Sequence, residues 1–360
     1  MQTRLAIARA VIVPYLASRF IVLATLVTTR HMFTTLRIAQ PVETRGGLLS
    51  WDAAWYRDIA RGGYDAVARE GLRFFPLFPL LGRAVSWVPG IGASNAVLIV
   101  ANLSALALGY VLYLLVMHER DDPALARRAV WLVYLVPPSF VLVMGYAEAT
   151  FMTAAAIVLL TLRTRRWWIA AAVAFAVGLV RPVGALLAVP AAVEGWQARD
   201  ARSVAPAVAP VAGCLAYLVW AQRRTHDFLY PLRVQQDPAR RGRWIDPIRA
   251  VAHSVNQLFT GDHVSAGVHA ASAVVFAVLL VVLARRWPLS FTLYAGVALA
   301  VALSSRNLDS LERYGLATIP NVLAGADLLT TEARERVVFT LAAAGLVGAA
   351  LLAFTGVLVP

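Results

Sequence analysis

Long apolar runs separated by short polar links dominate the pattern of this chain. A helix of about twenty apolar residues crosses a hydrocarbon layer roughly 30 Å thick. No stretch shows the alternation typical of a β-strand, so the pattern predicts an all-α polytopic membrane protein. The first run follows Arg4 and Arg9 and ends near Thr29, and the others cover 94–117, 129–146, 149–162, 167–193, 204–221, 266–284, 289–305, 315–329 and 337–359.

One of these runs does not have the length of an ordinary span. Residues 167–193 are too long for one level helix and too short for two, and Arg181-Pro182 interrupts them near the middle. A proline and a charge at that place favour a broken hairpin. Splitting the run gives about eleven spans and puts the arginine-bearing links on one side, as the positive-inside rule prefers. One tilted helix is the alternative, and it would put several links outside.

On the split topology the N-terminus is cytoplasmic, and two long polar segments, 30–93 and 222–265, face the other side. We expect residues 1–360 to form a single integral-membrane domain in which these two external loops carry short interfacial helices. The cytoplasmic links carry these arginines: Arg120, Arg127, Arg128, Arg163, Arg165, Arg166, Arg199, Arg202, Arg285, Arg286, Arg334 and Arg336.

The composition excludes a soluble globule, because 60% of the residues are hydrophobic and 15% are charged. All 33 basic residues are arginine, and they exceed the acids by 13. This charge fits contact with anionic lipid or phosphate rather than nucleic acid, for which no basic-aromatic motif is present. The lysine-free, alanine-rich usage suggests a high-GC bacterium and a multi-pass protein of its plasma membrane. Cys214 is the only cysteine, which excludes an internal disulfide and a cysteine metal site.

The first external loop contains a candidate interfacial helix between Trp51 and Tyr64. If this segment is helical, its apolar and basic side chains lie on different faces, with Trp51, Trp55 and Ile59 on one and Arg57 and Arg61 on the other. Gly62-Gly63 would end the helix. Such a helix would lie in the plane of the membrane interface.

Asp52 falls in the first turn of this helix, where the helix dipole favours an ionised carboxylate that can accept a proton. The alternative is an N-terminal helix residue without a catalytic role. Trp51 and Trp55 can likewise be interface anchors rather than platforms for a sugar. The block Phe74–Leu81 follows, and its alternating prolines indicate a re-entrant or interfacial turn.

Together these segments resemble one family, the PIG-V-like (GPI mannosyltransferase II-like) mannosyltransferases of the GT-C glycosyltransferase superfamily. The matching segments, in the family's order over about residues 10–330, are Trp51–Tyr64, Phe74–Leu81, Tyr146-Ala147-Glu148, Trp167-Trp168 with Leu179–Gly184, Asp227–Gln235, and Arg313-Tyr314 with Pro320. The chain departs from the pattern at Thr225-His226-Asp227-Phe228, where Gly-Asp-Pro is more usual.

The resemblance implies a GT-C-like bundle, an essential acid in the first external loop, a polyprenyl-phosphate sugar as donor, and a glycolipid or glycan as acceptor. It identifies Asp52 as the catalytic acid. The candidates for binding the donor phosphate or sugar are Arg57, Arg61, Glu148, Arg181, Arg233, Arg306, Arg313 and Tyr314. The candidate substrate platform is formed by Trp51, Trp55, Tyr56, Tyr64 and Phe75.

Two arginines in apolar runs need partners. Arg181 at a helix break is costly unless it faces a polar cavity or is paired, which makes it a functional candidate or else a structural partner of Glu148 or a carbonyl. Arg19 in the first span can snorkel or pair internally. Arg306 and Arg313, with Asp309 and Glu312, form either a ligand site or a solvated charge cluster at an outer helix end.

Other chemistry has little support. The histidines lack zinc-site spacing, there is no Asp-x-Asp sequence, and no glycine-rich loop follows a strand, so neither a metal nor a cofactor is expected.

The pattern favours an inverting glycosyltransferase acting on the non-cytoplasmic face. A flippase or transporter of lipid-linked sugars is one alternative, although the inverted repeats of many transporters are not visible. A non-catalytic envelope-assembly protein is the other.

Overall fold

The computed structural model of the protein describes residues 2–237, 240–260 and 264–359, and its regular elements are all helices, with no strand in these ranges. The chain divides into two compact units. Unit 1 comprises Met1–Val67, Phe78–Ala156 and Gly325–Pro360, and unit 2 comprises Ala68–Leu77 and Ile157–Ala324. Five described helices are long and apolar enough to cross a membrane, within Leu5–Thr35, Ala93–Arg120, Ala201–Thr225, Gly267–Arg286 and Glu332–Phe354.

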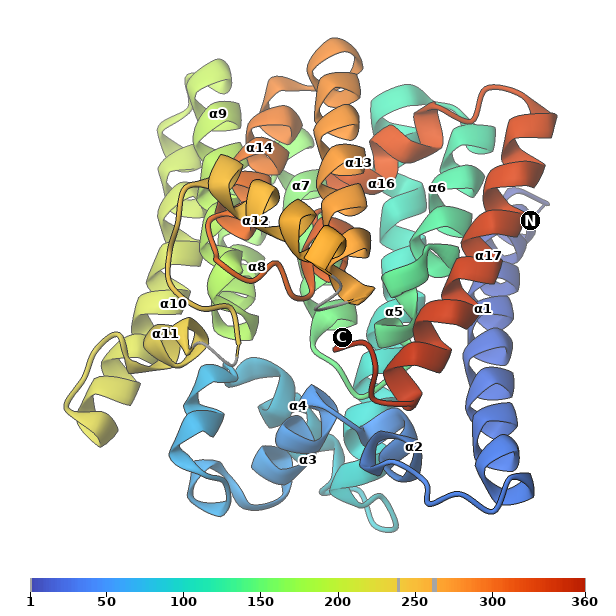
Figure 1. The fold of residues 1–360 in the computed structure, drawn as a ribbon. Coiled ribbons are helices and arrows are strands. Elements are labelled where there is room, and N and C mark those ends of the chain that lie inside the picture. Colours follow the sequence, from blue (N-terminus) through green and yellow to red (C-terminus); the bar gives the residue numbers. More distant parts are fainter. Residues whose placement is uncertain (1, 238–239, 261–263, 360) are drawn as a thin grey trace. The chain divides into compact units, whose positions relative to one another are not determined.

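In unit 1 the long helices α1, α5, α6 and α17 pack side by side (Figure 1). The first external loop folds into short helices that follow α1. The elements are α1 (Gln2–Thr35), α2 (Val42–Gly46), η1 (Gly47–Leu49), α3 (Asp52–Gly62), η2 (Tyr64–Ala66), α4 (Leu77–Val85), α5 (Ala93–Arg120), α6 (Pro123–Leu135), η4 (Pro137–Leu142), the start of α7 (Glu148–Arg163), and α17 (Glu332–Phe354).

In unit 2, α10 packs along both α8 and α9, and α13 packs against α12, α14 and α15. The elements are η3 (Arg69–Arg73), the rest of α7, α8 (Trp167–Val180), η5 (Pro182–Leu187), α9 (Ala188–Ala198), η6 (Ala201–Ser203), α10 (Val204–Thr225), α11 (Tyr230–Arg233), η7 (Val234–Gln236), α12 (Pro247–Thr260), α13 (Val264–Arg286), α14 (Leu289–Leu303), α15 (Leu311–Ala317) and α16 (Ile319–Asp327), whose last residues belong to unit 1.

Two runs predicted as single spans are broken, and the predictions for 129–146 and 315–329 are wrong in that respect. α6 ends at Leu135, before Pro137-Pro138, and the chain continues as the short turn η4. The second run divides at Thr318, and Pro320 lies in the first turn of α16. The residue before Pro137 leaves helical geometry, as a following proline favours, whereas Pro320 lacks the N–H that a helix continuing through Thr318 would need.

Residues 167–193 form the predicted broken hairpin. α8 ends before Arg181, whose extended backbone leads into η5, and α9 then returns. The indole nitrogen of Trp167, at the start of α8, donates a hydrogen bond to Asp200, just after α9, over 2.8 Å. Both ends of the hairpin therefore lie together, and the alternative of one tilted helix is wrong.

Three arginine-bearing links meet at the base of this hairpin. The Nη1 atom of Arg163 lies 3.1 Å from both carboxylate oxygens of Glu194 near the end of α9. Ser290 Oγ, at the start of α14, donates to the same carboxylate over 2.5 Å. Links 163–166, 199–202 and 285–288 thus lie at one end of unit 2, as the split topology requires.

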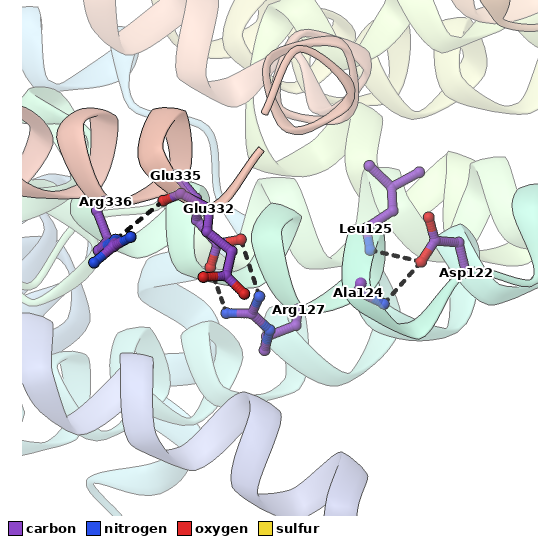
Figure 2. Close-up of polar contacts among 7 residues, drawn as sticks. All are labelled: Asp122, Ala124, Leu125, Arg127, Glu332, Glu335 and Arg336. Carbon is purple, nitrogen blue, oxygen red and sulfur yellow. Dashed lines mark hydrogen bonds and ion pairs between the residues drawn. The ribbon is translucent and has the colours of Figure 1, made fainter. Parts of the chain in front are cut away.

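In unit 1, too, two arginine-bearing links lie close together. Figure 2 shows Arg127 of α6 with its two terminal nitrogens on the carboxylate of Glu335 in α17, at 2.6 and 3.0 Å. Asp122 accepts from the backbone N–H groups of Ala124 and Leu125 and so caps the start of α6. The links that precede α6 and α17 therefore lie at one end of unit 1.

This grouping predicts which cysteines react with an impermeant thiol reagent in intact cells. In a Cys214→Ala background, cysteines introduced at the exposed positions Ala68 and Arg243 should be labelled, because both belong to loops that the sequence predicts to be external. A cysteine at the exposed Ala201, in an arginine-bearing link, should be labelled only after lysis. Labelling of the Ala201 position together with protection of the Arg243 position would contradict the topology.

Candidate functional site

The predicted site residues divide between the two units, and each group is described by itself. Unit 1 contains Trp51, Asp52, Trp55, Tyr56, Arg57, Arg61, Tyr64 and Glu148. Unit 2 contains Phe75, Arg181, Arg233, Arg306, Arg313 and Tyr314.

Asp52 is the first residue of α3, as predicted. Trp51 precedes it with a φ of 57°, a conformation that costs a non-glycine residue about 1–3 kcal/mol unless its surroundings hold it. The Trp51 indole donates to the carbonyl of Ala353 over 3.0 Å. The backbone N–H of Asp52 donates to the hydroxyl of the buried Tyr146 over 3.3 Å. Two distant segments of unit 1 therefore set the position of this carboxylate.

Glu148 begins α7 in a similar setting, and its side chain is buried. The backbone N–H of Gly145 donates to Leu48 over 3.0 Å, which joins the segments that precede α3 and α7. The backbone segments that precede α3 and α7 are thus hydrogen-bonded to each other, and each of these helices begins with an acid.

A buried polar network supports the turn before Glu148. Arg19 donates from Nε to the side-chain oxygen of Asn102 over 3.1 Å, and from Nη2 to the carbonyl of Leu142 over 2.8 Å. Asn102 in turn donates to the carbonyl of Val143 over 3.1 Å. Arg19 therefore pairs internally, which was one of its two interpretations, and it donates a hydrogen bond to the last residue of the short 3-10 helix η4.

The predicted faces of α3 need correction. The helix buries Ala53, Tyr56, Ile59 and Ala60, whereas Trp51 lies outside it, so Trp51, Trp55 and Ile59 do not form one face. The reason is tertiary: the Tyr56 ring meets the edge of Phe78 with centroids 4.9 Å apart, inside unit 1. Of the remaining candidates in this segment, Trp55 and Tyr64 are half-buried and Arg61 is exposed. Arg57 is paired with Asp58 at 2.8 Å.

In unit 2, Tyr314 lies against two guanidinium groups. The guanidinium carbon of Arg181 is 5.3 Å from the centre of the ring, and that of Arg241 is 4.6 Å from it. Arg241 also donates to the carbonyl of Ala302 over 2.6 Å, and Arg313 beside Tyr314 is 8% exposed. The break in the hairpin, the second external loop and α15 therefore meet around one aromatic ring.

Backbone pairing brings Arg241 to this place. The N–H groups of Arg306 and Asn307 donate to the carbonyls of Arg243 and Arg241, each over 3.0 Å. Gly242 between them has a φ of 68°, which glycine adopts without strain. Arg306 takes part in this pairing through its backbone N–H, and its side chain is exposed. Arg233 lies elsewhere in the loop and is paired with Asp227 at 2.9 Å.

Phe75 is buried, with its ring centre 4.5 Å from that of Tyr217 in α10. The Tyr217 hydroxyl donates to the carbonyl of Leu72 over 2.8 Å. Residues 72–75 are therefore fixed to α10. The interpretation of Phe74–Leu81 as a turn is wrong in its second half, because α4 begins at Leu77 and Pro79 lies in its first turn, where the missing N–H has no helical partner to lose.

Sequence reasoning omitted Arg241 and Tyr146 from the site. Arg241 belongs to a run of three arginines around Gly242, and only the backbone pairing decides which of them reaches Tyr314. Tyr146 is visible next to Glu148 as a motif, but its contact with Asp52 spans 94 residues. Among the residues that the structure describes, no group of three or more metal-ligating side chains is present.

Comparisons with known proteins support the fold. No family model matches the chain, and no curated protein matches it. The crystal structure of ArnT from Cupriavidus metallidurans bound to undecaprenyl phosphate has 16% identity and a TM-score of 0.51, over 79% of this chain and 57% of ArnT. The chain thus spans less than two thirds of ArnT. This likeness confirms the predicted fold class, a polytopic helical membrane bundle.

The Arg19 network predicts a large difference between two arginines of α1. Arg19→Met should lower the free energy of unfolding by about 2–4 kcal/mol, because it leaves Asn102 and a buried carbonyl without their charged donor. The matched control is Arg9→Met at an exposed position of the same helix, which should change stability by less than about 0.5 kcal/mol. Unfolding in detergent measures both. Equal effects would show that the network does not hold the turn.

Proposed function

We propose that the protein is a membrane glycosyltransferase that moves a sugar from a polyprenyl-phosphate donor to a hydroxyl of a glycolipid or glycan. The observation that carries the proposal is the placement of Arg181 and Arg241 on Tyr314 at a helix break, within a fold that resembles ArnT. ArnT was crystallised with undecaprenyl phosphate, a ligand of the class proposed here. Mannose is the sugar we favour, on the resemblance to PIG-V-like enzymes.

Asp52 serves as the general base in this proposal. Its carboxylate takes the proton of the acceptor hydroxyl while that oxygen attacks the anomeric carbon of the donor. The bond from the anomeric carbon to the phosphate oxygen breaks, and polyprenyl phosphate leaves with the bonding electrons on the opposite face. The configuration at the anomeric carbon is inverted. The hydrogen bonds of Trp51 to Ala353 and of Asp52 to Tyr146 support this role, because they hold the start of α3 in one position.

Arg181 and Arg241 bind the leaving phosphate in this proposal, with Arg313 and Tyr314 beside them. A guanidinium group donates two parallel hydrogen bonds to phosphate and keeps its charge at every physiological pH. The stacking of Arg181 and Arg241 on Tyr314 fixes the direction of both groups before the donor arrives. Charge that is already in place stabilises the developing phosphate anion without reorganisation.

Asp52→Asn tests the base. The amide keeps the size of the side chain and suits a helix N-terminus, so folding should survive, but the amide cannot take a proton. Transfer from polyprenyl-phosphate [14C]mannose to membrane glycolipid extract should fall about 10²–10⁴-fold. The matched control is Asp58→Asn in the same helix, whose carboxylate pairs with Arg57. If Asp52→Asn retains more than about a tenth of the activity, Asp58 or Glu148 takes the role.

Arg181→Gln, Arg241→Gln and Arg313→Gln should each weaken donor use about ten- to a hundredfold, with a smaller effect on acceptor use, because each removes a charge-assisted contact. The measurement is kcat/KM for the donor at saturating acceptor. Arg233→Gln is the control, since this exposed arginine is paired with Asp227, and its kcat/KM should stay within about threefold. Unchanged donor kinetics in folded Arg181 and Arg241 variants would contradict the phosphate site.

A further inference from the structure

The base of the hairpin in unit 2 gathers arginines that are far apart in the sequence. The links 163–166, 199–202 and 285–288 meet there through the contacts of Glu194 and Asp200. The three links contain seven arginines and one acid, Asp200, and the nearby Glu194 is a second acid. Six of the arginines are exposed and are called the link-end surface here: Arg165, Arg166, Arg199, Arg202, Arg285 and Arg286.

The two acids at this place already have partners. Glu194 is buried and binds Arg163 and Ser290. Asp200 accepts hydrogen bonds from the backbone N–H of Arg202 and from Trp167, and these bonds, with the nearby charges of Arg202 and Arg165, hold the pKa of its carboxyl below the usual value. Arginines from two different links therefore lie near one carboxylate. The link-end surface as a whole keeps an excess of positive charge.

Two exposed tryptophans lie next to the links that form this surface. Trp168 at the start of α8 is 68% exposed, and Trp196 near the end of α9 is 77% exposed. Exposed tryptophans are typical of the boundary between lipid tails and headgroups. Apolar side chains that are also exposed, among them Ile169 and Leu289, continue from the tryptophans and the links into the helices. The link-end surface therefore has the composition typical of the boundary between headgroups and lipid tails.

We propose that the link-end surface binds the headgroup of an anionic phospholipid, a site separate from the donor site. Basic clusters between membrane helices on the cytoplasmic side are suited to anionic lipid phosphates. The tryptophans beside the arginines favour a lipid over a soluble anion, because the acyl chains contact the apolar helix surface while the phosphate meets the guanidinium groups. The proposal does not depend on the catalytic role of the protein.

Binding of phosphatidylglycerol to purified protein tests the site. The variant removes one arginine from each link: Arg166→Gln, Arg202→Gln and Arg285→Gln, all at exposed positions. Each arginine contributes about fivefold to affinity, so the triple variant should bind roughly a hundredfold more weakly. The matched control removes the same charge from links of unit 1, with Arg120→Gln, Arg334→Gln and Arg336→Gln. Native mass spectrometry counts the bound lipids, and thermal unfolding measures stabilisation by the lipid.

The expected result is loss of high-affinity phosphatidylglycerol binding in the first variant and its retention in the control. Phosphatidylcholine and free glycerol phosphate should not replace phosphatidylglycerol in the parent protein. Equal loss in both triple variants, or equal binding of phosphatidylcholine or glycerol phosphate, would overturn the proposal. If the triple variant does not fold, the three single variants apply the same test, with a fivefold loss expected from each.

Discussion

A hydrocarbon layer provides no hydrogen-bond partner, so each interruption of a membrane helix must be satisfied by the protein itself. This constraint governs the places where the chain departs from helical geometry. The stretch between α6 and α7 receives its donors from Arg19 and Asn102. The break after α8 carries Arg181, which lies against Tyr314. Where the helices break, the chain must concentrate polar side chains, and those side chains are the ones available for chemistry.

Two groups of arginines in this protein have different physical roles. Those in short links lie at the base of the helices, where they pair with acids such as Glu194 and Glu335 or remain exposed. Those at breaks and in the second external loop are held by stacking and by carbonyls, as Arg241 is by Tyr314 and Ala302. Net charge alone does not separate the two classes, because each contributes to the same excess of 13.

The proposed function requires a carboxylate and a set of guanidinium groups that are rigid before substrate binds. The start of α3 meets the first requirement, since a strained Trp51 and the Tyr146 hydroxyl fix Asp52. The ring of Tyr314 meets the second, since it orients two cations at once. Two of the predicted aromatic platform residues, Tyr56 and Phe75, are instead packed in the interior of their own unit.

The sequence by itself determined the fold class, the broken hairpin at Arg181-Pro182 and the helix that begins at Asp52, because these depend on local hydrophobicity, proline geometry and helix ends. It also determined that polar residues would be needed at the break. Only the tertiary structure decided which face of α3 is buried, that Arg241 rather than another loop arginine meets Tyr314, and that Tyr146 supports Asp52. Those outcomes depend on contacts between segments far apart in the chain, whose packing energies no local pattern contains.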